Sequence, residues 1–358
     1  MTEFSCGTRL IAGSGSLAAL KEMGARRAMV VTDPFFMKNG TAEYAADLAA
    51  PVWEIFDRVE PDPTVTLVAE GTARMQSFRP DTVIALGGGS AMDCAKAMLY
   101  FSRSQAKLVA VPTTSGSGSE VTDFAILTHD GVKHPLVDPR LRPRVAILDD
   151  KLLTALPPAL VADSGFDVLS HAMEAMVAKN ASPVTDALAK DAFCTVFRDL
   201  PASYEGNQSL RLGIHVAAAM AGMAFTQAGL GVCHALAHSL GGLYHIPHGR
   251  LNAILLPAVM ECNDLALDKY AMLARAAGFG GSADRMTVRN LKNGLIRLRR
   301  QLNLPETLAQ AGVEPRQVWH DGDALVAAAL ADPCCSTNPT VVEEGMLRRI
   351  LSEVTGSV

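Results

Sequence analysis

The chain has 358 residues, a hydrophobic fraction of 49%, a charged fraction of 19% and a formal net charge of −5. A chain of this length exceeds the size at which one hydrophobic core keeps growing, so we expect two domains. Lysine and arginine are scattered, and no apolar run reaches the roughly 18 residues of a membrane span. This pattern argues against nucleic-acid-binding and membrane proteins, and we expect neither kind of partner.

The N-terminal segment and the cysteines indicate where the protein works. MTEFSCGTRLIAG lacks the basic start and apolar stretch of a secretory signal. Seven cysteines without CxxC spacing indicate reduced thiols, and we expect a cytoplasmic protein. Cys233 adjoins His234, but a neighbouring residue on a helix points about 100° away. We interpret Cys233 as a packed thiol.

In the first 150 residues or so, short β-rich segments alternate with segments of helical periodicity. This alternation predicts a parallel sheet with crossover helices and a ligand cleft at the carboxyl ends of the strands. From Pro157 onward only helical segments follow. We therefore expect an α/β nucleotide-binding domain over 1–154 and an all-helical domain over 155–358. The predicted strands are Arg27–Thr32, Val52–Phe56, Thr82–Leu86, Lys107–Val111 and Val145–Leu148.

Two glycine-rich loops follow consecutive predicted strands. Gly87-Gly88-Gly89-Ser90 precedes a helix, and Pro112 to Ser119 reads PTTSGSGS. Backbone N–H groups at a glycine-rich helix start can approach a phosphate closely. Two such loops side by side suggest a nucleotide across the sheet, although neither is a GxGxxG or a Walker A motif.

Two charged residues near these loops allow two interpretations each. Asp33, after the first predicted strand, can bind a ribose hydroxyl and repel a 2′-phosphate, which favours NAD over NADP. It can equally cap the helix that follows Pro34. His129-Asp130-Gly131 predicts a turn, after which Lys133 either returns toward the nucleotide or is a solvated hairpin charge.

Six of the nine histidines lie in one stretch of the helical part. Asp167 and His171 are four residues apart, so they share one face of a predicted helix. His234 and His238 repeat this spacing, and a turn can bring His248 back toward them. One carboxylate and several imidazoles indicate a site for Zn²⁺ or Fe²⁺ rather than Ca²⁺. A single such pair is also compatible with core histidines whose nitrogens are satisfied.

Four segments together resemble the iron-containing (group III) alcohol dehydrogenase family: GGGSAMDCAKA, PTTSGSGSEVT, GFDVLSHAMEA and GLGVCHALAHSLGGLYHIPHG. The resemblance extends over nearly the whole chain. It implies an α/β nucleotide-binding domain with a parallel sheet and an all-α metal-binding domain, an architecture shared with dehydroquinate synthase. The implied activity is metal-dependent, NAD(H)-linked interconversion of short-chain aldehydes and primary alcohols, such as propanal and 1-propanol or acetaldehyde and ethanol. Ligand identity does not separate Fe²⁺ from Zn²⁺.

The resemblance also assigns residues. It makes Asp167, His171, His234 and His248 the metal ligands, and places His238 as a catalytic residue near the nicotinamide. Glu174, three residues after His171, either supports the metal site or faces solvent. The implied cofactor contacts are Asp33, Gly87, Gly88, Gly89, Ser90, Asp93, Thr113, Thr114, Ser117, Val121, Lys133 and Phe225.

Two departures from the family pattern stand out. Pro61-Asp62-Pro63 has Asp where many members have Asn, which alters a contact near the adenosine. Ser117 stands where Thr is frequent, which keeps the hydroxyl.

Within the family, the opening SCGTRLIAGSGSLAAL and GMAFTQAGLG are most similar to propanol dehydrogenases of propanediol-utilisation microcompartments. This similarity implies a homodimer that works in the cytoplasm. It also allows an association of the protein with a microcompartment. The alternatives are a glycerol or other polyol dehydrogenase, whose metal shell usually lacks one of these histidines, and a dehydroquinate synthase-like lyase. The lyase would need basic residues near the metal, and a non-enzymatic scaffold would not need four ligands.

Overall fold

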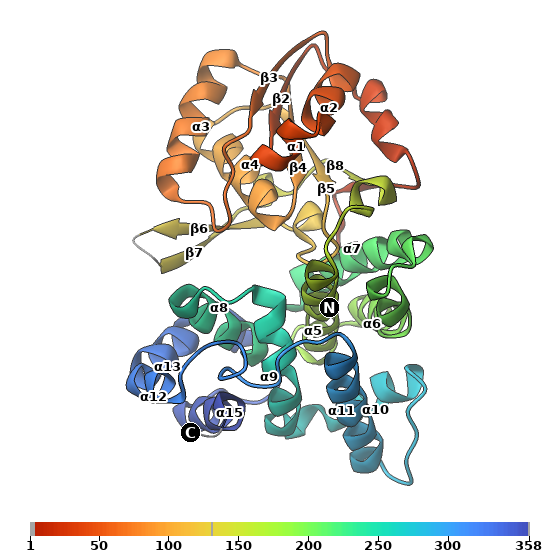
Figure 1. Ribbon diagram of the computed structural model, residues 1–358, viewed down its shortest axis with the longest axis vertical. Coiled ribbons are helices and arrows are strands. Elements are labelled where there is room, and N and C mark those ends of the chain that lie inside the picture. Colours follow the sequence, from red (N-terminus) through yellow and green to blue (C-terminus); the bar gives the residue numbers. More distant parts are fainter. Residues whose placement is uncertain (1–3, 130–131, 357–358) are drawn as a thin grey trace. The chain divides into compact units, whose positions relative to one another are not determined.

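The structure is a computed structural model, and it describes residues 4–129 and 132–356. The described residues form two compact units, one of Ser5–Leu156 and one of residues 157–356 together with Phe4. The first has a parallel sheet with helices and the second is helical (Figure 1), which confirms the predicted architecture.

A six-stranded parallel sheet, in the order β1-β8-β5-β4-β2-β3, is the centre of the first unit. The five predicted strands are present, each within one residue of the expected ends. Strand β1 pairs with β8 at the edge and was not predicted, because its four residues lack a buried alternating pattern. The strands are β1 (Arg9–Ala12), β2 (Arg27–Val31), β3 (Val52–Phe56), β4 (Thr82–Gly87), β5 (Lys107–Pro112) and β8 (Val145–Leu148).

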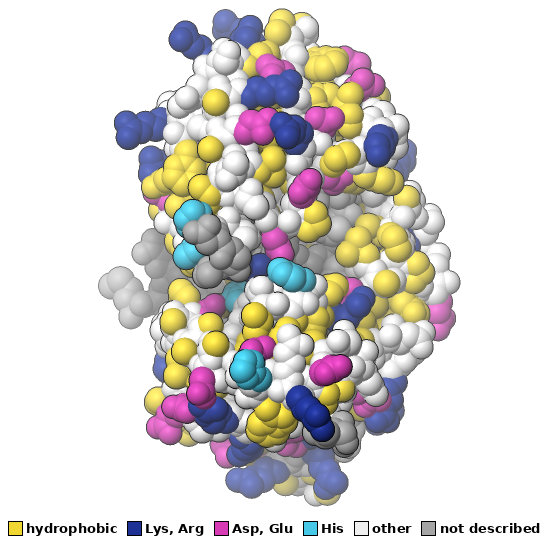
Figure 2. Space-filling view, turned by 60° about the vertical axis from the view of Figure 1, so that its left-hand side comes forward, with side chains coloured by type: hydrophobic (Ala, Val, Ile, Leu, Met, Phe, Trp, Pro, Cys, Tyr) yellow, Lys and Arg dark blue, Asp and Glu magenta, His cyan; other side chains and the backbone are white. Residues whose placement is uncertain are grey.

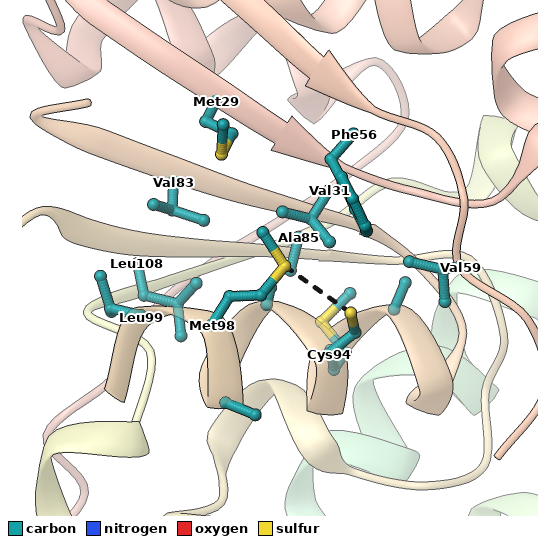
Figure 3. Packing of buried hydrophobic residues seen from close by; sticks show 14 of the residues in the cluster. Met29, Val31, Phe56, Val59, Val83, Ala85, Cys94, Met98, Leu99 and Leu108 are labelled. Atoms are coloured by element: carbon teal, nitrogen blue, oxygen red, sulfur yellow. Dashed lines mark hydrogen bonds between the residues drawn. The ribbon is translucent and has the colours of Figure 1, made fainter. Parts of the chain in front are cut away.

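Alternate residues of the central strands pack on opposite faces of this sheet. Met29 and Val31 of β2 belong to one buried cluster, and Val30 to the other. Figure 3 shows the first cluster, in which Met98 and Cys94 extend from helix α4 toward the strands. Burial on both faces is expected of a parallel sheet covered by helices on both sides. The helices are α1 (Pro34–Lys38), α2 (Thr41–Ala49), α3 (Val65–Phe78) and α4 (Gly89–Ser102).

The strand order reverses between β2 and β4. From β2 the chain continues to β3 on one side, whereas β4 lies on the other side of β2 and leads on to β5. Ligands of open parallel sheets bind at such a reversal, at the carboxyl ends of the strands. Asp33 follows β2 and Gly87 ends β4. The predicted nucleotide residues therefore flank the reversal point.

A separate hairpin of β6 (Phe124–His129) and β7 (Val132–Val137) follows β5. Asp130 and Gly131 of the predicted turn lie outside the described residues. The backbone N–H of Thr128 donates to the carbonyl of Pro63 at 2.9 Å, so the hairpin packs against the loop before α3.

In the second unit, α5 packs against α6, α7 and α9. By length and composition alone the segment Gln208–Ala228, which includes α7, is long and apolar enough to cross a membrane, with a mean hydropathy of 1.2. Its packing against α5 and α6 is that of a core helix. The helices are α5 (Pro158–Val177), α6 (Pro183–Tyr204), α7 (Arg211–Ala228), α8 (Val232–Tyr244), α9 (His248–Cys262), α10 (Leu267–Ala276), α11 (Asp284–Gln301), α12 (Pro315–His320), α13 (Gly322–Ala331), α14 (Cys334–Thr337) and α15 (Glu344–Thr355).

Charged side chains are mixed on the surface. Figure 2 shows Lys and Arg interspersed with Asp and Glu over the visible face. Several form exposed pairs, such as Arg348 with Asp323 and Glu344. Exposed pairs of this kind contribute little to stability.

A buried lysine links α4 to the segment that follows β5. The Lys96 Nζ donates to the Ser119 Oγ at 2.9 Å, the Thr122 Oγ1 at 3.0 Å and the Phe124 carbonyl at 2.8 Å. Ser119 in turn donates to the Asp93 Oδ1 at 2.9 Å. Burial lowers the pKa of Lys96 to about 8, against the opposing effect of nearby carboxylates. The ammonium is therefore still mostly charged at neutral pH.

We expect Lys96→Met to lower the free energy of unfolding by about 3–5 kcal/mol, because it leaves buried acceptors and Asp93 without their cationic partner. Chemical denaturation followed by circular dichroism measures the change. Lys107→Met, at the exposed start of β5, is the control, and we expect a change within about 0.5 kcal/mol. Equal stabilities of the two variants would contradict this role of Lys96.

Candidate active site

The structure brings together the four residues that the resemblance implies as metal ligands. Asp167 and His171 lie on α5, His234 on α8 and His248 at the start of α9. One potential ligand atom from each lies within 4.8 Å of all the others. The Asp167 Oδ1 is 3.4 Å from the His248 Nε2 and 4.0 Å from the His234 Nε2. Four side chains at this spacing can share one cation.

Helical spacing and one glycine account for this convergence. The four-residue spacing of Asp167 and His171 places both on one face of α5. A Cβ atom on Gly249 would lie 1.9 Å from the carbonyl oxygen of Asp163 and 3.2 Å from the Cβ of Asp167. Only glycine at this position lets the start of α9 approach α5, which carries His248 to Asp167.

The electrostatics of the cluster suit a divalent cation. Burial lowers the pKa of His234 and of His248 well below the usual value, so both imidazoles are neutral, the form that binds metal. Burial alone would raise the pKa of Asp167, but positive charge at the surrounding rings and the hydrogen bond from the Asn252 amide, 2.8 Å from its Oδ1, lower it. An ionised carboxylate with neutral imidazoles is a donor set that fits Fe²⁺ or Zn²⁺.

Aromatic stacking holds the imidazoles in place. The ring of His171 stacks between Phe225, at a centroid distance of 4.4 Å, and His234, at 4.5 Å. Phe225 is buried. The residue that the resemblance places beside the nicotinamide therefore also contacts the metal cluster.

His238 stands outside the group of four. Its ring stacks on His248 with centroids 5.2 Å apart, and its Nδ1 lies 2.8 Å from the Asp332 Oδ2. Burial would raise the pKa of Asp332, but the hydrogen bond and charge of His238, together with hydrogen bonds from Cys334, lower the pKa to about 2. His238 is therefore held by a carboxylate that stays ionised. Sequence reasoning did not identify Asp332, because a single acid in a late loop carries no periodic signal.

Glu174 does not face solvent. Its side chain is 2% exposed, and its Oε2 lies 2.7 Å from the His234 Nδ1. Burial raises the pKa of Glu174 to about 7 against the lowering effect of three backbone N–H groups, and a nearby cation would lower it further. Of the two interpretations that the sequence leaves open, exposure to solvent is wrong, and support of the metal site stays a prediction.

In the first unit, the two glycine-rich loops lie against each other. A Cβ atom on Gly88 would lie 3.3 Å from the Thr114 Oγ1, and one on Gly89 would lie 3.3 Å from Ser117. Gly87 has φ +150°, and a Cβ atom added to it would lie 2.6 Å from the Cβ of Ala91. The start of α4 has no side-chain cap among the described residues. Backbone N–H groups there can bind an anion.

Asp33 caps a helix in this structure. Its Oδ1 accepts hydrogen bonds from the N–H groups of Phe35 at 2.9 Å and Phe36 at 3.4 Å. Its Oδ2 lies 3.6 Å from the Cβ position of Gly87, beside the glycine turn. The capping interpretation is confirmed, and the contact with a ribose hydroxyl stays a prediction.

The remaining residues implied for the cofactor differ in their surroundings. Thr113 and Val121 are buried, and Ser90 is half-buried. Both oxygens of Asp93 accept hydrogen bonds within the protein, from the Ser119 hydroxyl and the Ile126 N–H. Asp93 thus braces the loop, and its cofactor contact stays a prediction.

Lys133 pairs with Asp62, the residue that departs from the family pattern. The Lys133 Nζ lies 2.6 Å from the Asp62 Oδ1. The lysine is a hairpin charge held by a partner, and its contact with the nucleotide stays a prediction.

Comparisons with known proteins agree with this site. Residues 7–150 match the family model of iron-containing alcohol dehydrogenase, and residues 161–355 match the C-terminal model of the same family. The chain is 42% identical to the 1-propanol dehydrogenase PduQ of Citrobacter freundii, over 99% of this chain and 100% of that protein. It is 36% identical to the NADPH-dependent butanol dehydrogenase of Clostridium saccharobutylicum, over 98% and 97%.

A solved structure shows the same fold. The iron-containing alcohol dehydrogenase of Thermococcus thioreducens has a TM-score of 0.93 and 32% identity, covering 99% of this chain and 100% of that one. The chain therefore belongs to the iron-containing alcohol dehydrogenase family, and it interconverts alcohols and aldehydes with NAD and a metal ion.

Proposed function

We propose that this protein interconverts propanal and 1-propanol, and related short-chain aldehydes and primary alcohols, with NAD(H) and a divalent metal ion. The observation that carries the proposal is the cluster of one carboxylate and three imidazoles in the helical unit. The identity of 42% with a 1-propanol dehydrogenase supports the choice of substrate. We assign nucleotide binding to residues 1–154 and the metal site to residues 155–358.

We assign the metal to Asp167, His171, His234 and His248. A divalent cation held there, Fe²⁺ in keeping with the family and Zn²⁺ as the alternative, would act as a Lewis acid on the substrate oxygen. The Asp167 carboxylate neutralises only part of the cation's charge, because the imidazoles are neutral. Positive charge therefore remains to stabilise an alkoxide.

We assign proton exchange to His238. Asp332 accepts a hydrogen bond from the His238 Nδ1 at 2.8 Å, which orients the ring and leaves the Nε2 to take or give a proton. Stacking on His248 keeps the ring next to the metal cluster. During aldehyde reduction this imidazole would deliver the proton that converts the alkoxide into the alcohol.

We assign the cofactor to the loops at the strand ends. The uncapped start of α4, with Gly88, Gly89 and Ser90, would bind the pyrophosphate through backbone N–H groups. Bound NAD(H) supplies or accepts the hydride. Asp33, which follows β2, favours NAD over a cofactor with an extra phosphate.

We also propose that the protein is a homodimer that works in the cytoplasm, in association with a microcompartment. The similarity to the 1-propanol dehydrogenases PduQ of Citrobacter freundii and Salmonella typhimurium supports this setting. Light scattering of the purified protein tests the dimer, and fractionation of the native host tests the association.

The activity has a direct test. Protein purified without oxygen should oxidise NADH in the presence of propanal, lose this activity on chelation and regain it with Fe²⁺ or Zn²⁺. Absorbance at the NADH band measures the rate, and the metal that restores it identifies the native ion. Metal-bound protein that turns over no propanal, acetaldehyde or longer aldehyde would contradict the proposed substrate class.

Two variants separate metal binding from proton exchange. Asp167→Ala should lose both bound metal and activity, because it removes the charged ligand of the cluster. His238→Ala should retain the metal and lower turnover by about 10²–10⁴-fold, the usual contribution of a general acid or base. Elemental analysis and steady-state rates measure the two properties. Full activity in metal-depleted Asp167→Ala would refute the ligand assignment.

Asp33→Asn tests the cofactor preference without removing the helix cap, because Asn is as good an N-cap as Asp. We expect kcat/KM for NADPH to rise relative to NADH by about tenfold or more, since about 1.4 kcal/mol of charge repulsion corresponds to that factor. Asp57→Asn, at the end of β3, is the matched control and should change the ratio less. An unchanged ratio in Asp33→Asn would leave cofactor choice to other residues.

A further inference from the structure

Glu174 is surrounded by donors from a single segment of the chain. Its Oε2 accepts a hydrogen bond from the Gly231 N–H at 2.9 Å and lies 3.4 Å from the backbone nitrogen of His234. Its Oε1 accepts a hydrogen bond from the Cys233 N–H at 2.7 Å. These N–H groups form the start of α8, whose first residue is Val232. The fourth contact of Glu174 is with a side chain, the His234 Nδ1, at 2.7 Å.

The surroundings leave little freedom to this carboxylate. A Cβ atom on Gly231 would lie 2.8 Å from the Glu174 Oε1 and 2.6 Å from the Asn338 Oδ1. Glycine at 231 therefore lets the backbone close around both polar groups. The buried carboxylate is the acceptor for one face of the helix start, and it belongs to α5, the helix that also supplies Asp167 and His171.

This contact selects one tautomer of His234. The backbone N–H groups of Gly231 and Cys233 can only donate, so the carboxylate accepts from them on both oxygens. An Nδ1–H that donates to Oε2 places the lone pair of the ring on Nε2, the nitrogen that lies 4.0 Å from the Asp167 Oδ1. The opposite tautomer would turn a proton toward the metal cluster. Histidine ligands of metals commonly donate their other ring N–H to a carboxylate in this way.

A residue that only stabilises the start of α8 would have a different set of contacts from Glu174. Asn338 accepts the Val232 N–H at 3.2 Å and thus binds the same helix start. Within the described part of the chain, the other hydrogen bonds of its side chain are with Asn263 and the Thr340 carbonyl, and not with the His234 ring. A residue that only secures α8 would have the same effect as Asn338. A residue that prepares the ligand would affect metal binding beyond its effect on stability.

We propose that Glu174 is a positioning residue of the metal site, which holds His234 in the Nε2-binding tautomer. This inference rests on the proposed assignment of His234 as a ligand. It makes Glu174 part of the metal-binding apparatus although it does not itself touch the cation.

The test compares metal affinity in three full-length variants. Co²⁺ is titrated into metal-free protein in competition with a chelator, and the visible spectrum of bound Co²⁺ reports the ligand geometry. Glu174→Gln should weaken binding by about 10–100-fold and alter the spectrum, the range seen when such supporting carboxylates are removed. Asn338→Ala is the matched control and should keep affinity within about threefold and the spectrum unchanged, although it also removes a bond to the helix start.

A third variant keeps the test decisive if Glu174→Gln does not fold. Glu174→Asp retains the charge and both acceptor oxygens but withdraws them by one methylene, and it should weaken Co²⁺ binding to an intermediate degree. Wild-type affinity and spectrum in the folded Glu174 variants, or equal losses in Asn338→Ala, would overturn the inference alone. Wild-type protein that binds no metal would overturn the proposed metal site and this inference with it.

Discussion

The site depends on the close contact between the start of α9 and the middle of α5. Gly249 permits this contact, because its missing Cβ leaves room for the Asp163 carbonyl. Arg250 secures it through two bonds to the Asp163 carboxylate, at 2.9 Å and 3.1 Å. Consecutive residues therefore supply a candidate ligand, the space for it and its anchor. Since Asp163 lies one turn before Asp167, the ion pair sets where His248 meets the carboxylate of the cluster.

This contact also determines the chemistry of the imidazoles. Side chains brought together in a helix core lose most of their hydration, and desolvation disfavours the charged form of histidine. The lowered pKa of His234 and His248 follows from burial first. Repulsion between protonated rings acts in the same direction. Packing therefore keeps the imidazoles of His234 and His248 neutral, so they need not lose a proton before a cation binds.

Much of this arrangement could be predicted from the sequence. The alternation of strands and helices predicts the sheet, and residues four apart on a helix share a face, so Asp167 and His171 could be paired. The loops at Gly87 and Thr113 could be placed together because they follow consecutive strands of a parallel sheet. Each of these inferences uses periodicity or chain order, which are local properties.

The missing parts depend on tertiary packing. Asp332 meets His238 across 94 residues, and Asn338 meets Val232 across 106. No local spacing relates such partners. Asp33 shows a further limit of sequence-based prediction. The pattern that suggests a ribose contact also suggests a helix cap, and the two oxygens of one carboxylate can serve both roles. The edge strand β1 escaped notice because a half-exposed strand of four residues has no distinctive pattern.

Two carboxylates, of which sequence reasoning identified only Glu174, contact ring nitrogens of two histidines. Glu174 contacts the Nδ1 of His234, and Asp332 contacts the Nδ1 of His238. In each case the N–H is directed to the acid, so the Nε2 keeps the lone pair. One Nε2 then faces the Asp167 side of the cluster and the other is available for a proton. Under the proposed assignments, histidines one helical turn apart have different tasks, because α5 supplies one acidic partner and the loop after α13 supplies the other.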